Sequence, residues 1–154
     1  MNHEQAGMLD TVEERLPYAA KNVKRLGLCV FLVGLHSLTL GSFIFFFTDA
    51  FYTFFFGVQV DNPFLVKQAG LFLFCLGLFY LVPITDLQNK HRVVDLIIVT
   101  KVLAVLFLLT SAKLVALPGP IFLAAAGDAI MGTLLIFCSL SAGLFMKKAN
   151  RSQV

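Results

Sequence analysis

Four long apolar runs, separated by short polar or turn-forming segments, dominate the hydropathy pattern of the chain. They cover residues 26–47, 64–84, 93–116 and 121–146. A transmembrane helix needs about 20 predominantly apolar residues to cross a hydrocarbon core of about 30 Å, and each run is of that order. Only helices and closed barrels satisfy the backbone hydrogen bonds of a segment in lipid. The pattern therefore predicts an all-α integral membrane protein, a four-helix bundle that forms one domain over residues 26–146.

The segments that flank the bundle are polar. Residues 1–25 carry several acidic groups and no apolar stretch of the signal-peptide kind,. They are predicted to be a cytoplasmic N-terminal segment, either a frayed tail or a short interfacial helix that ends near Pro17, with Thr11 and Glu14 as a capping box. Residues 147–154 are predicted to be a basic cytoplasmic tail.

An aromatic-rich segment, TDAFYTFFFG, occupies residues 48–57 between the first two spans. Thr48 or Asp49 can cap a helix that Gly57 can end, but such a helix is too short to span. Aromatic side chains favour the depth of the lipid headgroups. The segment is therefore predicted to lie in the outer interface, where a lid or a docking surface for lipid or a partner is its functional alternative.

Small residues mark the faces on which the helices are expected to pack. Glycines recur every seven residues in the first two spans, and small residues line one face of the fourth. Small side chains let neighbouring backbones approach closely in membranes. The predicted helix-packing positions are Gly27, Gly34, Gly41, Gly70, Gly77 and Gly132.

The basic residues that flank the spans predict the orientation. On one side lie Lys21, Lys24, Arg25, Lys90, Arg92, Lys147, Lys148 and Arg151, against Lys67 and Lys113 on the other. Cytoplasmic loops carry the excess of lysine and arginine in membrane proteins. Both termini are therefore predicted to be cytoplasmic, in a multi-pass protein of the inner (plasma) membrane.

Three ionisable residues fall at similar depth within the spans: His36, Lys101 and Asp128. A lone charge at mid-membrane costs at least about 2.5–3.5 kcal/mol on insertion scales, so two charges on adjacent helices are expected to pair. The Lys101–Asp128 pair is either an inert structural pair or part of a proton, ion or ligand site. For His36 the alternatives are a neutral imidazole bonded to a neighbouring helix and a proton-carrying partner of Asp128.

The amino-acid composition excludes several classes of function. With 58% hydrophobic and 14% charged residues the chain is too apolar for a soluble domain, and its net charge of +3 is spread without a basic run, which excludes nucleic-acid binding. The cysteines, Cys29, Cys75 and Cys138, show no C-x-x-C spacing. They are interpreted as buried apolar filler rather than as a disulfide framework or a zinc site. No metal and no cofactor is expected.

From Val60 onward, the run VDNPFLVKQAGLFLFCLGLFYL, the turn NKHR, and then TKVLAVLF, LPGP and AAAGDAIMG resemble the small four-helix bacterial membrane proteins of the DoxX-like type. The resemblance covers about residues 26–146 and is one of architecture. It implies an accessory protein of the bacterial inner membrane, since some such proteins are associated with redox complexes there. It assigns no catalytic residue to any position of this chain.

These observations predict a non-enzymatic membrane protein, because clustered histidines, paired carboxylates near a bilayer edge and a nucleophile elbow are all missing from the sequence. It would be an accessory subunit or a binder of lipid or apolar small molecules. Its expected partners are the lipid bilayer and either a partner membrane protein or a second copy of the chain. A small proton-coupled carrier or channel that uses His36, Lys101 and Asp128 is the first alternative. A subunit of a membrane oxidoreductase is the second.

Overall fold

The computed structural model of the protein describes residues 3–59, 61–87, 89–114 and 119–143, and side chains from Lys21 onward. Its elements are α1 (His3–Phe46), α2 (Thr48–Phe56), α3 (Phe64–Leu81), the 3-10 helix η1 (Val82–Thr85), α4 (His91–Leu114) and α5 (Pro120–Ser141). Four helical stretches are long and apolar enough to cross a membrane: Lys21–Phe46, Phe64–Thr85, His91–Leu114 and Pro120–Ser141. The predicted all-α, four-helix membrane domain is therefore confirmed.

The fourth helix is shorter than the span predicted over residues 121–146. It ends at Ser141, and Gly143 adopts a φ of 68°, in the left-handed region. A glycine in this conformation is a common helix stop, because it carries no Cβ to clash with the following carbonyl. The end of the span predicted over residues 93–116 and the basic tail over residues 147–154 lie outside the described residues.

The first helix is much longer than the short interfacial helix proposed for residues 1–25. α1 begins at His3 and continues without a break through Pro17 to Phe46, so the expected end near Pro17 is wrong. A proline inside a helix removes one hydrogen bond and crowds the preceding turn, at a cost of about 3 kcal/mol. That cost is local, and good helix formers on both sides of Pro17, such as Glu14 and Ala19, allow the helix to resume.

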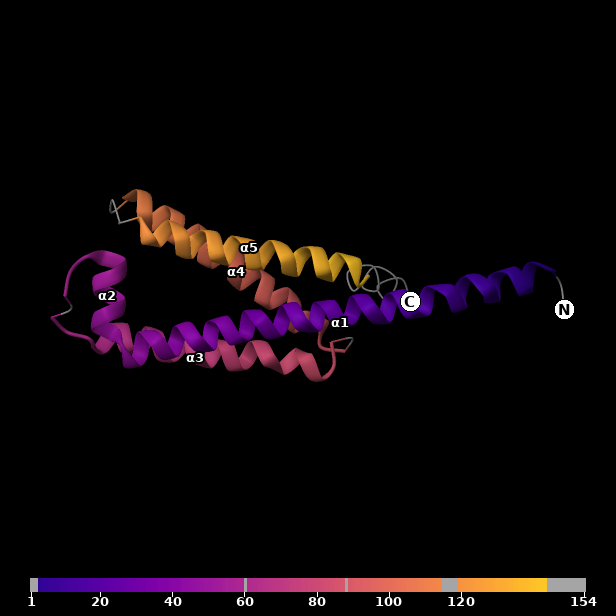
Figure 1. The fold of residues 1–154 in the computed structure, drawn as a ribbon, viewed down its shortest axis with the longest axis horizontal. Coiled ribbons are helices and arrows are strands. Elements are labelled where there is room, and N and C mark those ends of the chain that lie inside the picture. The colour runs from indigo at the N-terminus through magenta and orange to yellow at the C-terminus, as the bar shows by residue number, and fades with distance from the viewer. Residues whose placement is uncertain (1–2, 60, 88, 115–118, 144–154) are drawn as a thin grey trace.

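The spanning helices form two pairs (Figure 1). α1 lies along α3, α4 lies along α5, and a smaller contact between α1 and α5 joins the pairs. Two groups of basic residues mark one end, which we call the basic end: Lys21, Lys24 and Arg25 on α1, and Lys90 and Arg92 beside the α3–α4 connection. The pairs diverge toward the opposite end, where α2 lies across the end of α1.

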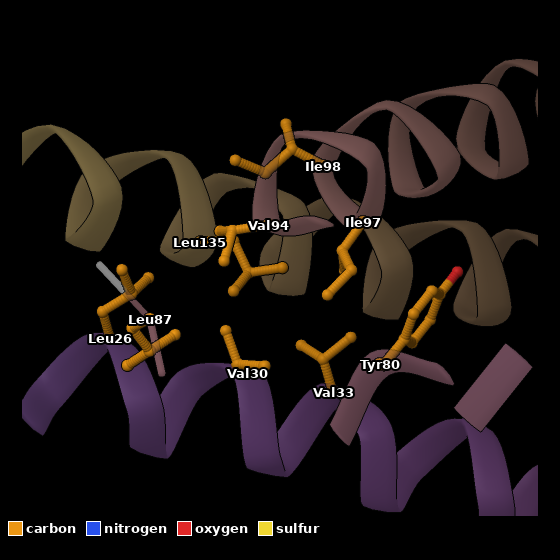
Figure 2. Close-up of a cluster of buried hydrophobic side chains, with 9 residues drawn as sticks. All are labelled: Leu26, Val30, Val33, Tyr80, Leu87, Val94, Ile97, Ile98 and Leu135. Atoms are coloured by element: carbon orange, nitrogen blue, oxygen red, sulfur yellow. The ribbon is translucent and has the colours of Figure 1, made fainter. Parts of the chain in front are cut away.

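A cluster of fully or largely buried side chains holds the two pairs together (Figure 2). Its members come from α1, α3, α4, α5 and the α3–α4 connection: Leu26, Val30, Val33, Tyr80, Leu87, Val94, Ile97, Ile98 and Leu135. Lipid tails are as apolar as leucine, so this cluster stabilises the bundle by close packing rather than by removal of apolar surface from water.

Glycines set the separation of α1 and α3. A Cβ added at Gly41 would lie 2.5 Å from the backbone nitrogen of Phe74, and one added at Gly77 would lie 2.7 Å from that of Leu38. Gly34 and Gly70 are equally crowded, because their added Cβ atoms would lie within 3 Å of neighbouring atoms. The seven-residue spacing on both helices therefore lets the two backbones come into direct contact.

The other two predicted packing glycines are less crowded. A Cβ added at Gly27 would meet only the end of the Leu87 side chain, at 3.2 Å, and one added at Gly132 would lie at an ordinary 3.4 Å from the Lys101 Cβ. Neither glycine brings two backbones together. Gly132 instead leaves room above the lysine stem.

The aromatic segment is a helix, α2, and its end agrees with the prediction. Gly57 takes a φ of 70° and its N–H donates to the Thr53 carbonyl. The start differs, because Phe47 is the N-cap residue and makes no side-chain cap, while the Thr48 hydroxyl donates back to the Ile44 carbonyl at 2.8 Å. Thr48 therefore serves the end of α1, which was not foreseen, since serine and threonine can bond backward as well as forward.

Candidate intramembrane polar site

A lysine and an aspartate meet in the middle of the α4–α5 pair. Lys101 Nζ donates to Asp128 Oδ1 at 2.6 Å, and the side chains are only 6% and 17% exposed. At a rise of about 1.5 Å per residue, Lys101 lies about 15 Å from the start of α4 and Asp128 about 12 Å from the start of α5. Since the helices are antiparallel neighbours, these depths bring both groups to the interior of the hydrocarbon layer.

The ion pair lies at the bottom of a groove of about 200 Å³ between α4 and α5. The groove is lined by Lys101, Val102, Val105 and Leu106 from α4, and by Asp128, Ala129, Gly132, Thr133 and Ile136 from α5. Val102, Leu106 and Ile136 are exposed on the outer surface of the bundle. The groove therefore opens toward lipid, with apolar walls and a charged floor.

The Lys101–Asp128 pair, which forms the charged floor of the groove, can make further hydrogen bonds. An ammonium group has three donors, and within the described residues Asp128 Oδ1 is the acceptor that Lys101 Nζ contacts. The second carboxylate oxygen of Asp128 accepts no hydrogen bond among the interactions of the described residues. Two donors of the ammonium group and one oxygen of the carboxylate are therefore left without a partner, side by side in a pair without net charge.

The structure places His36 near the pair but not in it. The imidazole is on α1, exposed at the bundle surface, and within electrostatic range of both Lys101 and Asp128. Among the described side chains it makes no hydrogen bond to either charge. The predicted three-residue centre is thus a two-residue ion pair with a histidine nearby.

Tyr80 is a polar neighbour of the site that the sequence did not reveal. Only 2% of it is exposed, and it lies near Thr100, the residue before Lys101. Thr100 belongs to a different helix, α4, so the spacing of residues along the chain does not show that the two are neighbours.

Together, the fold and this site define a polytopic α-helical membrane protein with an ion pair inside one helix pair. The chain matches no protein-family model, no curated protein and no solved structure. The resemblance to the DoxX-like proteins therefore stays a prediction.

Proposed function

We propose that the protein is a non-enzymatic accessory protein of the bacterial inner membrane that binds an uncharged apolar molecule carrying a hydroxyl group in the α4–α5 groove. The observation that supports this most is the Lys101–Asp128 pair at the floor of a groove that opens toward lipid. A structural pair would be best sealed within the bundle. This one keeps Asp128 partly exposed.

The chemistry of the floor favours a hydroxyl over other groups. A hydroxyl both donates and accepts, so it can accept from Lys101 Nζ and donate to the free oxygen of Asp128. A carboxylate would compete with Asp128 for the lysine and add a net charge to a low-dielectric site, which is costly. A hydrocarbon would leave both polar groups without a further partner.

The size of the groove limits what it holds. Pockets that enclose a whole drug-sized ligand have volumes of about 300–1,000 Å³, whereas this groove measures about 200 Å³. It therefore holds the hydroxyl end and a few carbons. The rest of the molecule lies along the exposed apolar surface of α4 and α5, in contact with acyl chains.

Photolabelling in nanodiscs tests this assignment. We expect a long-chain alcohol with a diazirine near its hydroxyl to label residues of the groove, and dodecanol to compete about tenfold better than dodecane or dodecanoate, as for one net hydrogen bond to a charged group of about 1.5 kcal/mol. Lys101→Met with Asp128→Leu should abolish the preference for the alcohol. Equal competition by the three chains, or labelling unchanged in the double variant, would remove the proposal.

The alternative of a proton-coupled carrier depends on His36. A carrier needs a path along which protons pass between ionisable groups, and the imidazole makes no described hydrogen bond to the ion pair. The observations therefore favour binding over transport.

The orientation is part of the same proposal. The basic residues at the basic end favour a bundle with both termini in the cytoplasm. We expect cysteines introduced at Gln59 and Asp61, beyond the end of α2, to react in intact cells with a membrane-impermeant maleimide, and a cysteine at Asn89 to react only after lysis. The native Cys75 lies inside the α3 span, out of reach of this reagent, and Cys75→Ser serves as a further control for it. Reaction of the Asn89 position in intact cells would reverse the orientation.

A further inference from the structure

Two of the three cysteines, distant in sequence, lie against each other. Cys29 on α1 and Cys138 on α5 bring their Sγ atoms to 3.3 Å, and both are free thiols. Cys75 is exposed on α3. The interpretation of all three as buried apolar filler is therefore wrong for Cys75, and it is incomplete for the other two.

The two sulfurs are in direct contact and need only a small approach to reach bonding distance. A disulfide is about 2.05 Å long, so the two sulfurs, now 3.3 Å apart, need to approach by only about 1.3 Å. Both residues are half-buried, at the edge of the buried cluster that joins the helix pairs. Rotation of the side chains can supply much of such a shift without separating the helices.

The pair lies near the basic end of the bundle. Cys29 lies about 6 Å along α1 from Arg25, and Cys138 about 4.5 Å before the end of α5 at Ser141, by the helical rise of about 1.5 Å per residue. Nearer the basic end, about two turns before Cys29 on α1 and about one turn after Cys138 on α5, the Asn22 side-chain amide donates to the Ser141 carbonyl at 3.0 Å. This second α1–α5 contact holds the two helices together beside the sulfurs.

We propose that Cys29 and Cys138 form a redox-active dithiol that low-molecular-weight disulfides oxidise to an intramolecular bridge. One thiolate attacks the small disulfide, which forms a mixed disulfide and releases one thiolate. The second cysteine thiolate then attacks the protein sulfur of that mixed disulfide and releases the other thiolate. Two electrons pass from the cysteines to the small disulfide, which leaves as two thiols carrying the two protons.

The disulfide bridge would link the two helix pairs covalently where they contact each other. α1 packs mainly on α3, and α5 mainly on α4, so the α1–α5 contact is where the pairs meet. A covalent link there fixes the pairs to each other at the basic end and leaves the α2 end as it is. This holds for either orientation of the bundle and is independent of what the α4–α5 groove binds.

The experiment treats the full chain in nanodiscs with glutathione disulfide, blocks the remaining thiols with a maleimide, and maps the products by mass spectrometry. We expect a linked peptide pair that contains Cys29 and Cys138, one maleimide on Cys75, and a higher apparent Tm. A phosphine reductant should restore three reactive thiols. Maleimide on all three cysteines after oxidation, or glutathione retained on Cys29 and Cys138 without a link, would overturn the proposal.

Matched variants separate the pair from the third thiol. Cys75→Ser should keep the bridge and the rise in Tm. Cys138→Ser should lose both and should retain glutathione on Cys29, because the resolving thiol is missing. A bridge that needs Cys75 would refute the pairing, and if Cys138→Ser does not fold, the peptide map of the unmodified sequence decides by itself.

Discussion

Replacing Lys101 by methionine, or Asp128 by leucine, is expected to lower the free energy of unfolding by about 3–5 kcal/mol, because each change leaves a buried charge without its partner. The structure places the two charged atoms 2.6 Å apart, with little exposure. The double variant removes both charges and fills the same volume with apolar groups. It should therefore recover most of the loss, to within about 1 kcal/mol of the parent.

Unfolding by SDS in mixed micelles, followed by circular dichroism, measures this cycle. Lys113→Met is the control, since Lys113 lies on the same helix but is exposed, and its replacement should change stability by no more than about 0.5 kcal/mol. If the losses of the two single variants simply add in the double variant, the two side chains do not stabilise each other. The groove would then lose its proposed floor.

Gly41→Leu is expected to separate α1 from α3 and to cost at least about 3 kcal/mol, at the upper end of the range for overpacked sites. A Cβ at this position would already lie 2.5 Å from the backbone nitrogen of Phe74 and 2.7 Å from the Gly70 carbonyl oxygen. Backbone atoms cannot move aside as a flexible side chain can. The helices must therefore shift apart, which breaks the contact at Gly34 and Gly77 as well.

Gly127→Leu provides the matched control. Gly127 lies inside α5, and nothing is within 4 Å of a Cβ added there. Leucine is a better helix former than glycine by about 0.8 kcal/mol, so this variant should be neutral or slightly stabilised in the same unfolding assay. Equal losses for Gly41→Leu and Gly127→Leu would show that the effect reflects leucine in a helix and not contact between α1 and α3.

The glycine spacing shows how much of the helix packing could be predicted from the sequence pattern. It correctly indicated close approach on the first two spans, because a seven-residue repeat keeps small residues on one helix face. It did not distinguish Gly41, where backbones touch, from Gly27, where only a leucine side chain is near. That difference depends on the angle and separation of the two helices, which a single helix does not encode.

The ends of the helices show the same limit. Gly57 ends α2 as predicted, whereas Gly143, inside the span predicted over residues 121–146, takes a positive φ beyond the end of α5. The helix predicted to end near Pro17 continues through it to Phe46. Local signals are preferences of about 1–3 kcal/mol, and the neighbouring residues can outweigh them.

The sequence by itself determined that the protein lies in lipid and that its fold is helical. Four apolar runs have spanning length, and helices satisfy the backbone hydrogen bonds of such segments in lipid. It also singled out Lys101 and Asp128, since charges at that depth are too costly to stand alone. Only the tertiary structure decided that the pair lies in an open groove, that His36 stays outside its hydrogen bonds, and that Cys29 meets Cys138. Depth follows from counting residues along a helix, whereas the direction a side chain faces depends on how the helices rotate against one another when they pack.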